Sequence, residues 1–291
     1  MAIVFGAIAP HGFPIIPELS DDAEGGLATR EAMHELGRRA KAAGVEVIVI
    51  AGPHGFRVND HVFLADVARG AGTLFWGGKK VEMNLPVDGQ LTDGIAAAAR
   101  ERGVPVALGG FAGNRRSQSV IPMDWGMMTP LWFLGHDRNL EGKGDVLAKA
   151  PADDIGPPAV LVSPSRSMPR EHLVEFGRAV AQAAESDGRR VAFVASCDWG
   201  HCHREDGPYG YNPMSAEVDA EVVAAVKAND LHSLISISDE RSTEAAIDGL
   251  WQTLMLAGVQ AEVPMDVDFL TYEAPTYYGM IVASYTPTNA A

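Results

Sequence analysis

The sequence has few cysteines and no long apolar run, and each shortage excludes a class of protein. Its 291 residues include two cysteines, Cys197 and Cys202. Two cysteines cannot build a disulfide scaffold, and their spacing fits neither a C-x-x-C redox motif nor a zinc finger. No stretch reaches the roughly 18 consecutive apolar residues that a membrane span needs, so we expect no membrane partner. The opening MAIVFGAIAPHGFP lacks a basic region ahead of its apolar run, so we expect no signal peptide and a cytoplasmic protein.

Basic residues are also scarce, because 23 Lys and Arg stand against 38 Asp and Glu, a formal net charge of −15. A field of that sign repels phosphate backbones, and we expect no nucleic-acid partner. Apolar residues make up 47% of the chain, which is enough to bury a core and excludes a disordered acidic protein. The length lies near the ceiling for one core, roughly 250–300 residues. We expect residues 1–291 to form a single domain.

Short β-branched apolar runs alternate with longer helical patterns, which is typical of an α/β layered domain. We expect strands at 2–9, 45–51, 104–108, 159–163, 191–196 and near 278–284. We expect helices at 27–43, 93–102, 170–186, 215–228 and 243–257, with Ser215 as the N-cap of the fourth. The polar stretch 138–158 is interpreted as a surface excursion. The predicted fold is one αβα layered domain around a central, mostly parallel, twisted sheet.

Three of the expected strands end in a turn that carries histidine. These turns are APHG at 9–12 with His11, GPHG at 52–55 with His54, and SCDWGHCH at 196–203 with His201. Ligands of open α/β sheets bind outside the carboxyl ends of the strands, so neighbouring parallel strands would bring these turns to one crevice. Proline fixes φ before the histidine and glycine lets the chain turn away after it, which projects the imidazole outward. A lone histidine at a strand end is usually a hydrogen-bonded turn residue, but its recurrence favours a shared site.

Two imidazoles and one carboxylate with open positions are the ligand set of a mononuclear non-heme Fe(II) oxygenase. Carboxylate candidates in the late helical segment are Glu244 and Asp248, which lie four residues apart and can share a helix face. A carboxylate in so apolar a segment is costly to bury unless it meets a cation. A solvent-facing or hydrogen-bonded Asp248 is the alternative. Glu273 is a further candidate, although a glutamate beside tyrosines more often holds a loop by hydrogen bonds.

Six segments in a fixed order connect the chain to a known family. They are APHG at 9–12, GPHG at 52–55, PMDWGMMTPLWFLG at 122–135, ASCDWGHCH at 195–203, IDGLWQTLMLAG at 247–258 and YEAPTYYGM at 272–280. In their order and spacing, over nearly the whole chain, the sequence resembles the class III extradiol ring-cleavage dioxygenases, the superfamily of the protocatechuate 4,5-dioxygenase catalytic subunit.

The resemblance implies roles for particular residues. His11 and His54 would ligate Fe(II), and the third ligand, a glutamate in the family, would be Asp248, with Glu244 one turn earlier as the second choice. The family's acid/base histidine follows an S-x-D-x-x-H pattern, which here supplies Asp198 and His201.

The resemblance also bears on the substrate. Related subunits commonly carry a substrate-contacting histidine in the segment where this chain has Trp125. We assign Trp125 and Tyr209 to substrate binding, with Tyr211 and Trp199 as further aromatic candidates. Arg115 and Arg116 could clamp a substrate carboxylate, or they lie in a solvated loop.

These inferences together predict an Fe(II)-dependent extradiol dioxygenase that opens a catechol-type diol or aminophenol with both atoms of O₂. A small aromatic substrate and O₂ are the expected partners. We also expect a homo-oligomer, and a small second subunit stays open. Two alternatives on the same scaffold are a metal-dependent hydrolase and a non-catalytic binding protein.

Overall fold

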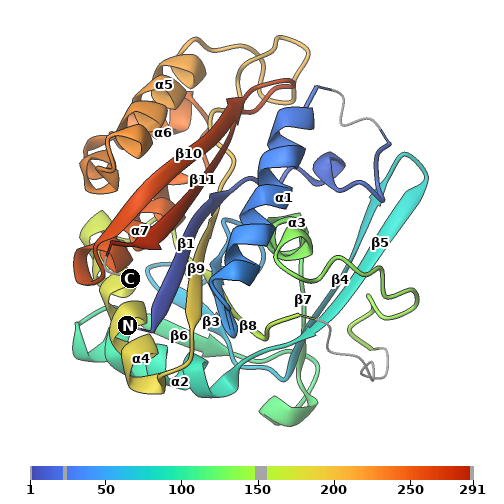
Figure 1. Cartoon of the computed structure of the whole chain (residues 1–291), viewed down its shortest axis with the longest axis vertical. Helices are drawn as coiled ribbons and strands as arrows, with labels where there is room; N and C mark the ends of the chain where they lie inside the picture. Colours follow the sequence, from blue (N-terminus) through green and yellow to red (C-terminus); the bar gives the residue numbers. More distant parts are fainter. Residues whose placement is uncertain (1, 22–24, 148–155, 289–291) are drawn as a thin grey trace.

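The computed structural model describes residues 2–21, 25–147 and 156–288 and contains a large central sheet (Figure 1). The described strands of this eight-stranded sheet follow the order β10-β11-β1-β9-β2-β8-β3-β6. Their bounds, in that order, are Met265–Glu273, Met280–Pro287, Ile3–Ala9, Val191–Ser196, Val47–Ala51, Ala159–Ser163, Val62–Ala65 and Val106–Gly109. The central strands β1, β9, β2 and β8 are parallel, and antiparallel pairs join β11 and β3 to them.

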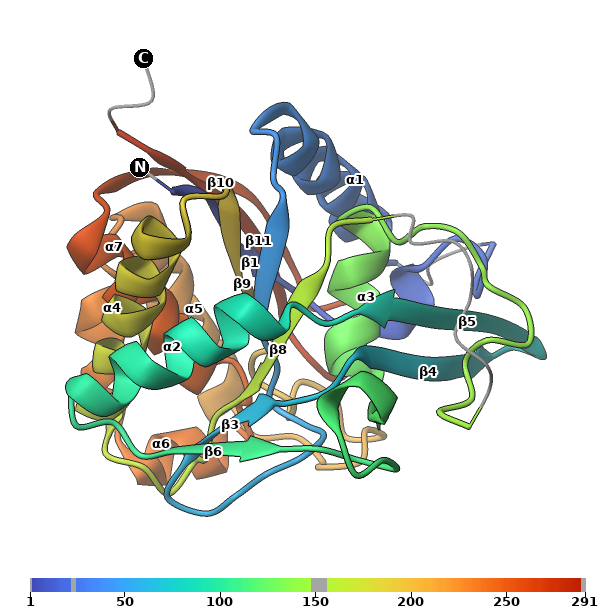
Figure 2. The same cartoon turned by 90° about the horizontal axis from the view of Figure 1, so that it is seen from below.

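Helices cover both faces of this sheet, as Figure 2 shows. One face packs on α2 (Gly89–Glu101), α4 (Arg170–Asp187), α5 (Met214–Lys227) and α7 (Leu250–Glu262). The other packs on α1 (Leu27–Ala42) and α3 (Trp125–Phe133). Alternate residues of the VIVIA strand enter the two cores, Val47 and Val49 on one side and Ile48 and Ile50 on the other. Burial on both faces explains its uninterrupted apolar run, and the predicted αβα fold class is confirmed.

The predicted helices at 27–43, 93–102, 170–186 and 215–228 are also present. Helix α2 begins four residues earlier than expected, because the Asp88 side chain accepts a hydrogen bond from Leu91 N and caps it. The N-cap assigned to Ser215 is wrong. Pro213 precedes the first turn of α5, and the Ser215 hydroxyl instead accepts from Cys202 N and donates to the Ala245 carbonyl.

The expected continuous helix at 243–257 is wrong, because the structure breaks it. Helix α6 (Asp239–Glu244) ends, and α7 begins only at Leu250. Ala246 adopts a left-handed φ of 49°, while the amides of Ala246 and Ile247 bond back to the carbonyls of Thr243 and Ser242. These two bonds form a Schellman C-cap with alanine where glycine is usual. Asp248 therefore lies in a non-helical segment between the two helices.

A second sheet of described residues was not predicted. It has the order β5-β4-β7 and comprises Lys79–Pro86, Arg69–Trp76 and Val120–Pro122. The glycines of β4 and the charges of β5 weaken the period-2 alternation by which a half-buried strand is recognised. Short 3-10 turns lie at Phe13–Ile15, Arg116–Gln118 and Leu231–Ser236. Within the described ranges, every helix is too short or too polar to cross a membrane.

Candidate metal centre

The three histidine-bearing turns meet at one edge of the central sheet. Strand β9 lies between β1 and β2 and runs parallel to both, with Ser196 paired to Ala9 and Ala195 paired to Ala51. The carboxyl ends of the three strands therefore bring His11, His54 and His201 to the same crevice, as the sequence predicted. The two P-H-G glycines serve different purposes. Gly55 takes a left-handed φ of 82°, whereas a Cβ on Gly12 would stand 2.2 Å from the Tyr278 hydroxyl.

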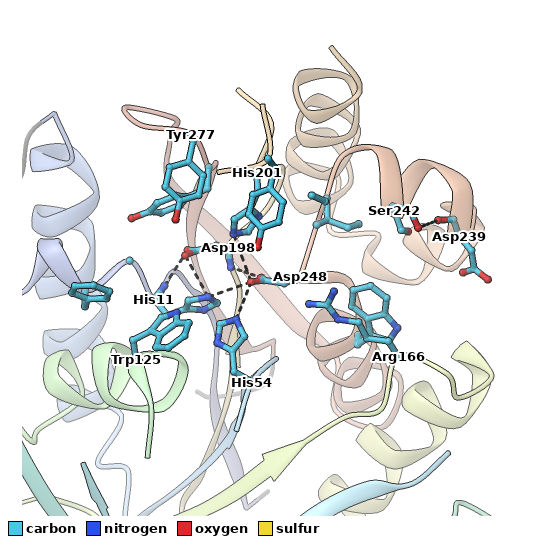
Figure 3. A pocket seen from close by; sticks show the side chains of 18 residues that line it. His11, His54, Trp125, Arg166, Asp198, His201, Asp239, Ser242, Asp248 and Tyr277 are labelled. Carbon is cyan, nitrogen blue, oxygen red and sulfur yellow. Dashed lines mark hydrogen bonds and ion pairs between the residues drawn. The ribbon is translucent and has the colours of Figure 1, made fainter. Parts of the chain in front are cut away.

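Asp248 joins the histidines from the break between α6 and α7 (Figure 3). Its Oδ2 lies 3.4 Å from His11 Nε2 and 3.5 Å from His54 Nε2. One donor atom from each of these three residues falls within 4.8 Å of the others. His11 and Asp248 are buried and His54 is half-buried. Glu244, the second choice for the carboxylate, is exposed at the end of α6 and lies outside the cluster.

Hydrogen bonds fix the tautomer of His11. Its Nδ1 lies 3.1 Å from the Ser196 hydroxyl, and that hydroxyl donates its own proton to the Gly126 carbonyl. Ser196 Oγ can then only accept from the ring, so neutral His11 carries its proton on Nδ1. Its Nε2 lone pair consequently faces Asp248 and His54. Histidines that ligate metals typically have their other ring nitrogen held by a hydrogen bond of this kind.

The charges of the centre interact strongly because the groups are buried. Burial opposes a charge on His11, but Asp198 and Asp248 outweigh it and raise the pKa of His11 to about 9. Burial also opposes a charge on Asp248, yet His11 and then His54 hold the pKa of this carboxyl well below its usual range. Burial raises the pKa of Asp198 although His11 opposes the shift. Asp248 is thus an anion that needs a buried cation beside it, and a divalent metal meets that need.

His201 and Asp198 lie at the rim of this cluster. His201 Nδ1 donates to the Trp199 carbonyl, 2.5 Å away, which leaves Nε2 of the neutral ring as an acceptor. That Nε2 is 3.8 Å from Asp248 Oδ2. Asp198 contacts His11 rather than His201, since it accepts from the His11 amide and its Oδ2 lies 3.3 Å from His11 Nε2. An unprotonated Nε2 that faces the Asp248 carboxylate can take up and return a proton.

A cavity of about 590 Å³ opens over these groups. The candidate substrate residues Trp125 and Tyr209 both line it. The Trp125 ring centroid is 4.6 Å from that of His54, and the Tyr209 centroid is 5.7 Å from that of His201. Trp199 is fully buried in the core, and Tyr211 is exposed outside the cavity lining.

The structure also adds residues that the sequence did not reveal. Tyr277, Tyr278, Arg166 and Trp251 line the cavity. The tyrosines belong to YEAPTYYGM, one of the six segments that carry the resemblance. Nothing in the local pattern marks Arg166.

Glu273 and Arg116 both lie outside the cavity lining. Glu273 forms hydrogen bonds, as predicted, but it holds a helix rather than a loop: its Oε2 accepts from the amide and hydroxyl of Thr29, in the first turn of α1, each at 2.7 Å. Arg116 does not clamp a ligand in the cavity. It pairs with Asp66 and Asp93, and neither Arg115 nor Arg116 is among the lining residues.

Asp219 of α5 anchors the loop that carries His201. This fully buried carboxylate accepts from the Gly200 amide at 2.7 Å, from His203 Nε2 at 2.8 Å and from the Tyr272 hydroxyl at 2.8 Å. A Cβ on Gly279 would stand only 2.0 Å from Asp219 Oδ2. The hydrogen bonds of Asp219 and its close packing against Gly279 hold the loop between the sheet and α5, and they thereby fix the position of His201.

Comparisons with known proteins identify a family and a fold. The model of a family described as the catalytic LigB subunit of aromatic ring-opening dioxygenase matches residues 6–283. Protein CA_C1420 of Clostridium acetobutylicum is 25% identical over 268 residues, which are 91% of this chain and 54% of that protein, so the chain spans about half the length of this relative. The crystal structure of the uncharacterized protein JW3007 from Escherichia coli K12 shares the fold, with a TM-score of 0.64 and 15% identity over 97% of this chain and 99% of that one.

Proposed function

This chain belongs to the family of catalytic LigB subunits of aromatic ring-opening dioxygenases, and from that premise we propose that it is an Fe(II)-dependent extradiol dioxygenase. Its substrate is a catechol-type diol or an aminophenol. The observation that carries the proposal is the convergence of His11 Nε2, His54 Nε2 and Asp248 Oδ2. Two imidazoles, one carboxylate and an open cavity match the donor set of a mononuclear non-heme iron site.

The donors fit a divalent cation in charge as well as in type. His11 presents its Nε2 lone pair because Ser196 fixes the tautomer, and Asp248 contributes a buried negative charge. His54 and the cavity complete one side of the site. A ferrous ion held there would acidify the hydroxyls of a diol. It would also supply the redox chemistry that lets O₂ react with the ring, since a closed-shell aromatic ring does not react with O₂ by itself.

The chain's own residues move the proton and hold the ring. His201 lines the cavity, and Nε2 of its neutral ring carries no proton and faces Asp248, so it takes a proton from the second hydroxyl of the diol and returns it later in the reaction. Trp125, Tyr209 and Tyr277 present aromatic surface to the same cavity. Such surfaces favour a flat ring and limit the access of water.

Metal analysis and an oxygen-uptake screen test the proposal together. Protein purified without oxygen should contain iron and should consume O₂ with catechol, protocatechuate, gallate or an aminophenol. Zinc without oxygen uptake would favour the hydrolase alternative instead.

An anaerobic titration of the iron-loaded protein with catechol separates an enzyme from a binding protein that lacks this chemistry. We expect a change in the absorption spectrum as the diol reaches the metal. An unchanged spectrum would contradict the proposal, and His54→Ala should abolish both the iron content and the change.

A further inference from the structure

The cavity is larger than a single aromatic ring requires. It measures about 590 Å³, whereas an apolar cavity of about 150 Å³ already admits benzene. The metal donors, Trp125, Arg166 and Trp251 all line it. In Figure 3, Arg166 and Trp125 lie on opposite sides of Asp248. A ring held at His11 and His54 therefore leaves space toward Arg166.

Arg166 reaches the cavity from the loop that follows β8. This strand lies beside β2 in the parallel part of the sheet, so its carboxyl end shares the edge that carries His54. Buried Ser165 anchors the loop, because its hydroxyl accepts from the Asp60 amide at 3.1 Å and lies 2.8 Å from the Ser167 hydroxyl. The backbone that presents Arg166 is thus held in place.

The guanidinium of Arg166 has an aromatic contact but no acidic partner. Its Cζ lies 4.7 Å from the ring centroid of Trp251. Within the described ranges, no carboxylate lies within ion-pair distance of it. Asp239 also lines the cavity, but its carboxylate is paired with Arg170 at 2.6 Å. A guanidinium stacked on an aromatic face keeps its N–H edge free, and that edge matches a carboxylate in a bidentate pair.

We propose that Arg166 and Trp251 form an anion subsite, and that the substrate is an aromatic diol with a carboxylate on an arm that reaches from the ring to Arg166. The diol part of this inference rests on the proposed function, whereas the carboxylate part rests on the Arg166 guanidinium alone. In a chain of net charge −15, long-range attraction does not gather anions. Selectivity for the acid then comes from the local charge of Arg166.

Steady-state kinetics on the iron-loaded protein test the subsite. Catechol is compared with 3,4-dihydroxybenzoate, 3,4-dihydroxyphenylacetate and 3,4-dihydroxyphenylpropionate. We expect the wild type to favour the acids with an arm, and Arg166→Met to lower the ratio of their kcat/KM to that of catechol by about 10- to 100-fold. Arg166→Lys should fall between the two. Arg115→Ala, an exposed arginine outside the cavity, is the matched control and should leave the ratio unchanged.

An anaerobic binding experiment separates the subsite from the chemistry. Calorimetry with 4-hydroxyphenylacetate, compared with phenol, should show tighter binding of the acid in the wild type and the loss of that difference in Arg166→Met. If this holds while no diol is opened, the subsite stands and the proposed function fails. If diols are opened but Arg166→Met affects acids and catechol equally, or if the acid binds no better than phenol, the subsite is overturned.

Discussion

The backbone amide of Asp198 donates a hydrogen bond of 3.0 Å to Oδ1 of Asp248. This bond joins the turn after β9 to the break between α6 and α7, two segments that lie 50 residues apart. With Oδ1 occupied, Oδ2 of Asp248 is the oxygen that faces His11, His54 and His201. One carboxylate therefore serves both as a support for the turn and as a donor to the cluster.

Replacing Asp248 with asparagine tests which carboxylate holds the metal. The variant keeps the shape of the side chain but removes the charge that the metal needs, so we expect iron affinity to fall by more than about 100-fold. Glu244→Gln removes an exposed charge outside the cluster and is the matched control. The iron content of each variant after anaerobic loading is the measurement. If Glu244→Gln lost iron while Asp248→Asn retained it, Glu244 rather than Asp248 would be the carboxylate ligand.

Ser196→Ala should weaken metal binding without removing a ligand. The hydroxyl fixes the tautomer of His11, and loss of such a support typically costs about 10- to 100-fold in metal affinity. Competition with a chelator measures the change. Ser186→Ala removes a hydroxyl that also bonds a backbone carbonyl, but at an exposed position, and should bind metal like the wild type. Equal affinities in both variants would contradict a role for Ser196.

Metal binding should release a proton and strengthen as the pH rises. In the metal-free chain the carboxylates raise the pKa of His11 to about 9, so His11 is protonated at neutral pH and the metal must displace that proton. The association constant should therefore rise about tenfold per pH unit from pH 7 toward 9 and level off above it. Calorimetry in two buffers that differ in ionisation enthalpy gives the number of protons released when the metal binds. Binding with no proton release would show that His11 is already neutral.

His201→Ala should separate proton transfer from metal binding. His201 does not belong to the three-residue donor cluster, so iron content should stay at the wild-type level. Loss of the acid/base group should lower kcat by about 10²- to 10⁴-fold. Oxygen uptake per iron atom is the measurement. An unchanged kcat at full iron loading would remove His201 from the mechanism.

Asp219→Ala should destabilise the fold through the loop that carries His201. The substitution leaves the Gly200 amide, His203 and the Tyr272 hydroxyl without their shared buried acceptor. We expect the free energy of unfolding to fall by about 3–5 kcal/mol. Urea unfolding at constant pH measures it, with the exposed Asp266→Ala as the control. A change below about 1 kcal/mol would mean that water replaces the carboxylate.

The sequence predicted those parts of the site that follow strands. His11, His54 and His201 could be assigned to one crevice because strand ends and P-H-G turns are local signals, and parallel neighbours bring such ends together. The carboxylate could not be settled in this way. Whether Asp248 or Glu244 faces the histidines depends on a helix break at Ala246, and an alanine gives no stop signal of the kind that glycine or proline gives.

Side chains that act across the cavity were harder to predict. Arg166 sits in a short loop with no motif, and its role depends on Trp251, which is 85 residues away in the sequence and becomes its neighbour only through tertiary packing. The second sheet was missed for a related reason, since the pattern of β4 and β5 is weak and their packing partners are distant. Local patterns thus predict where functional turns lie, and long-range contacts determine what surrounds them.

The most direct test of the central claim is isotope incorporation from labelled oxygen. Iron-loaded protein is supplied with a catechol-type diol under ¹⁸O₂, and the ring-opened product is trapped before its carbonyl oxygen exchanges with water. We predict that both oxygen atoms of one O₂ appear in the product, and that neither product nor label forms with Asp248→Asn. A ring-opened product with no label or a single label from O₂, or intact diol recovered from fully iron-loaded protein, would contradict the account.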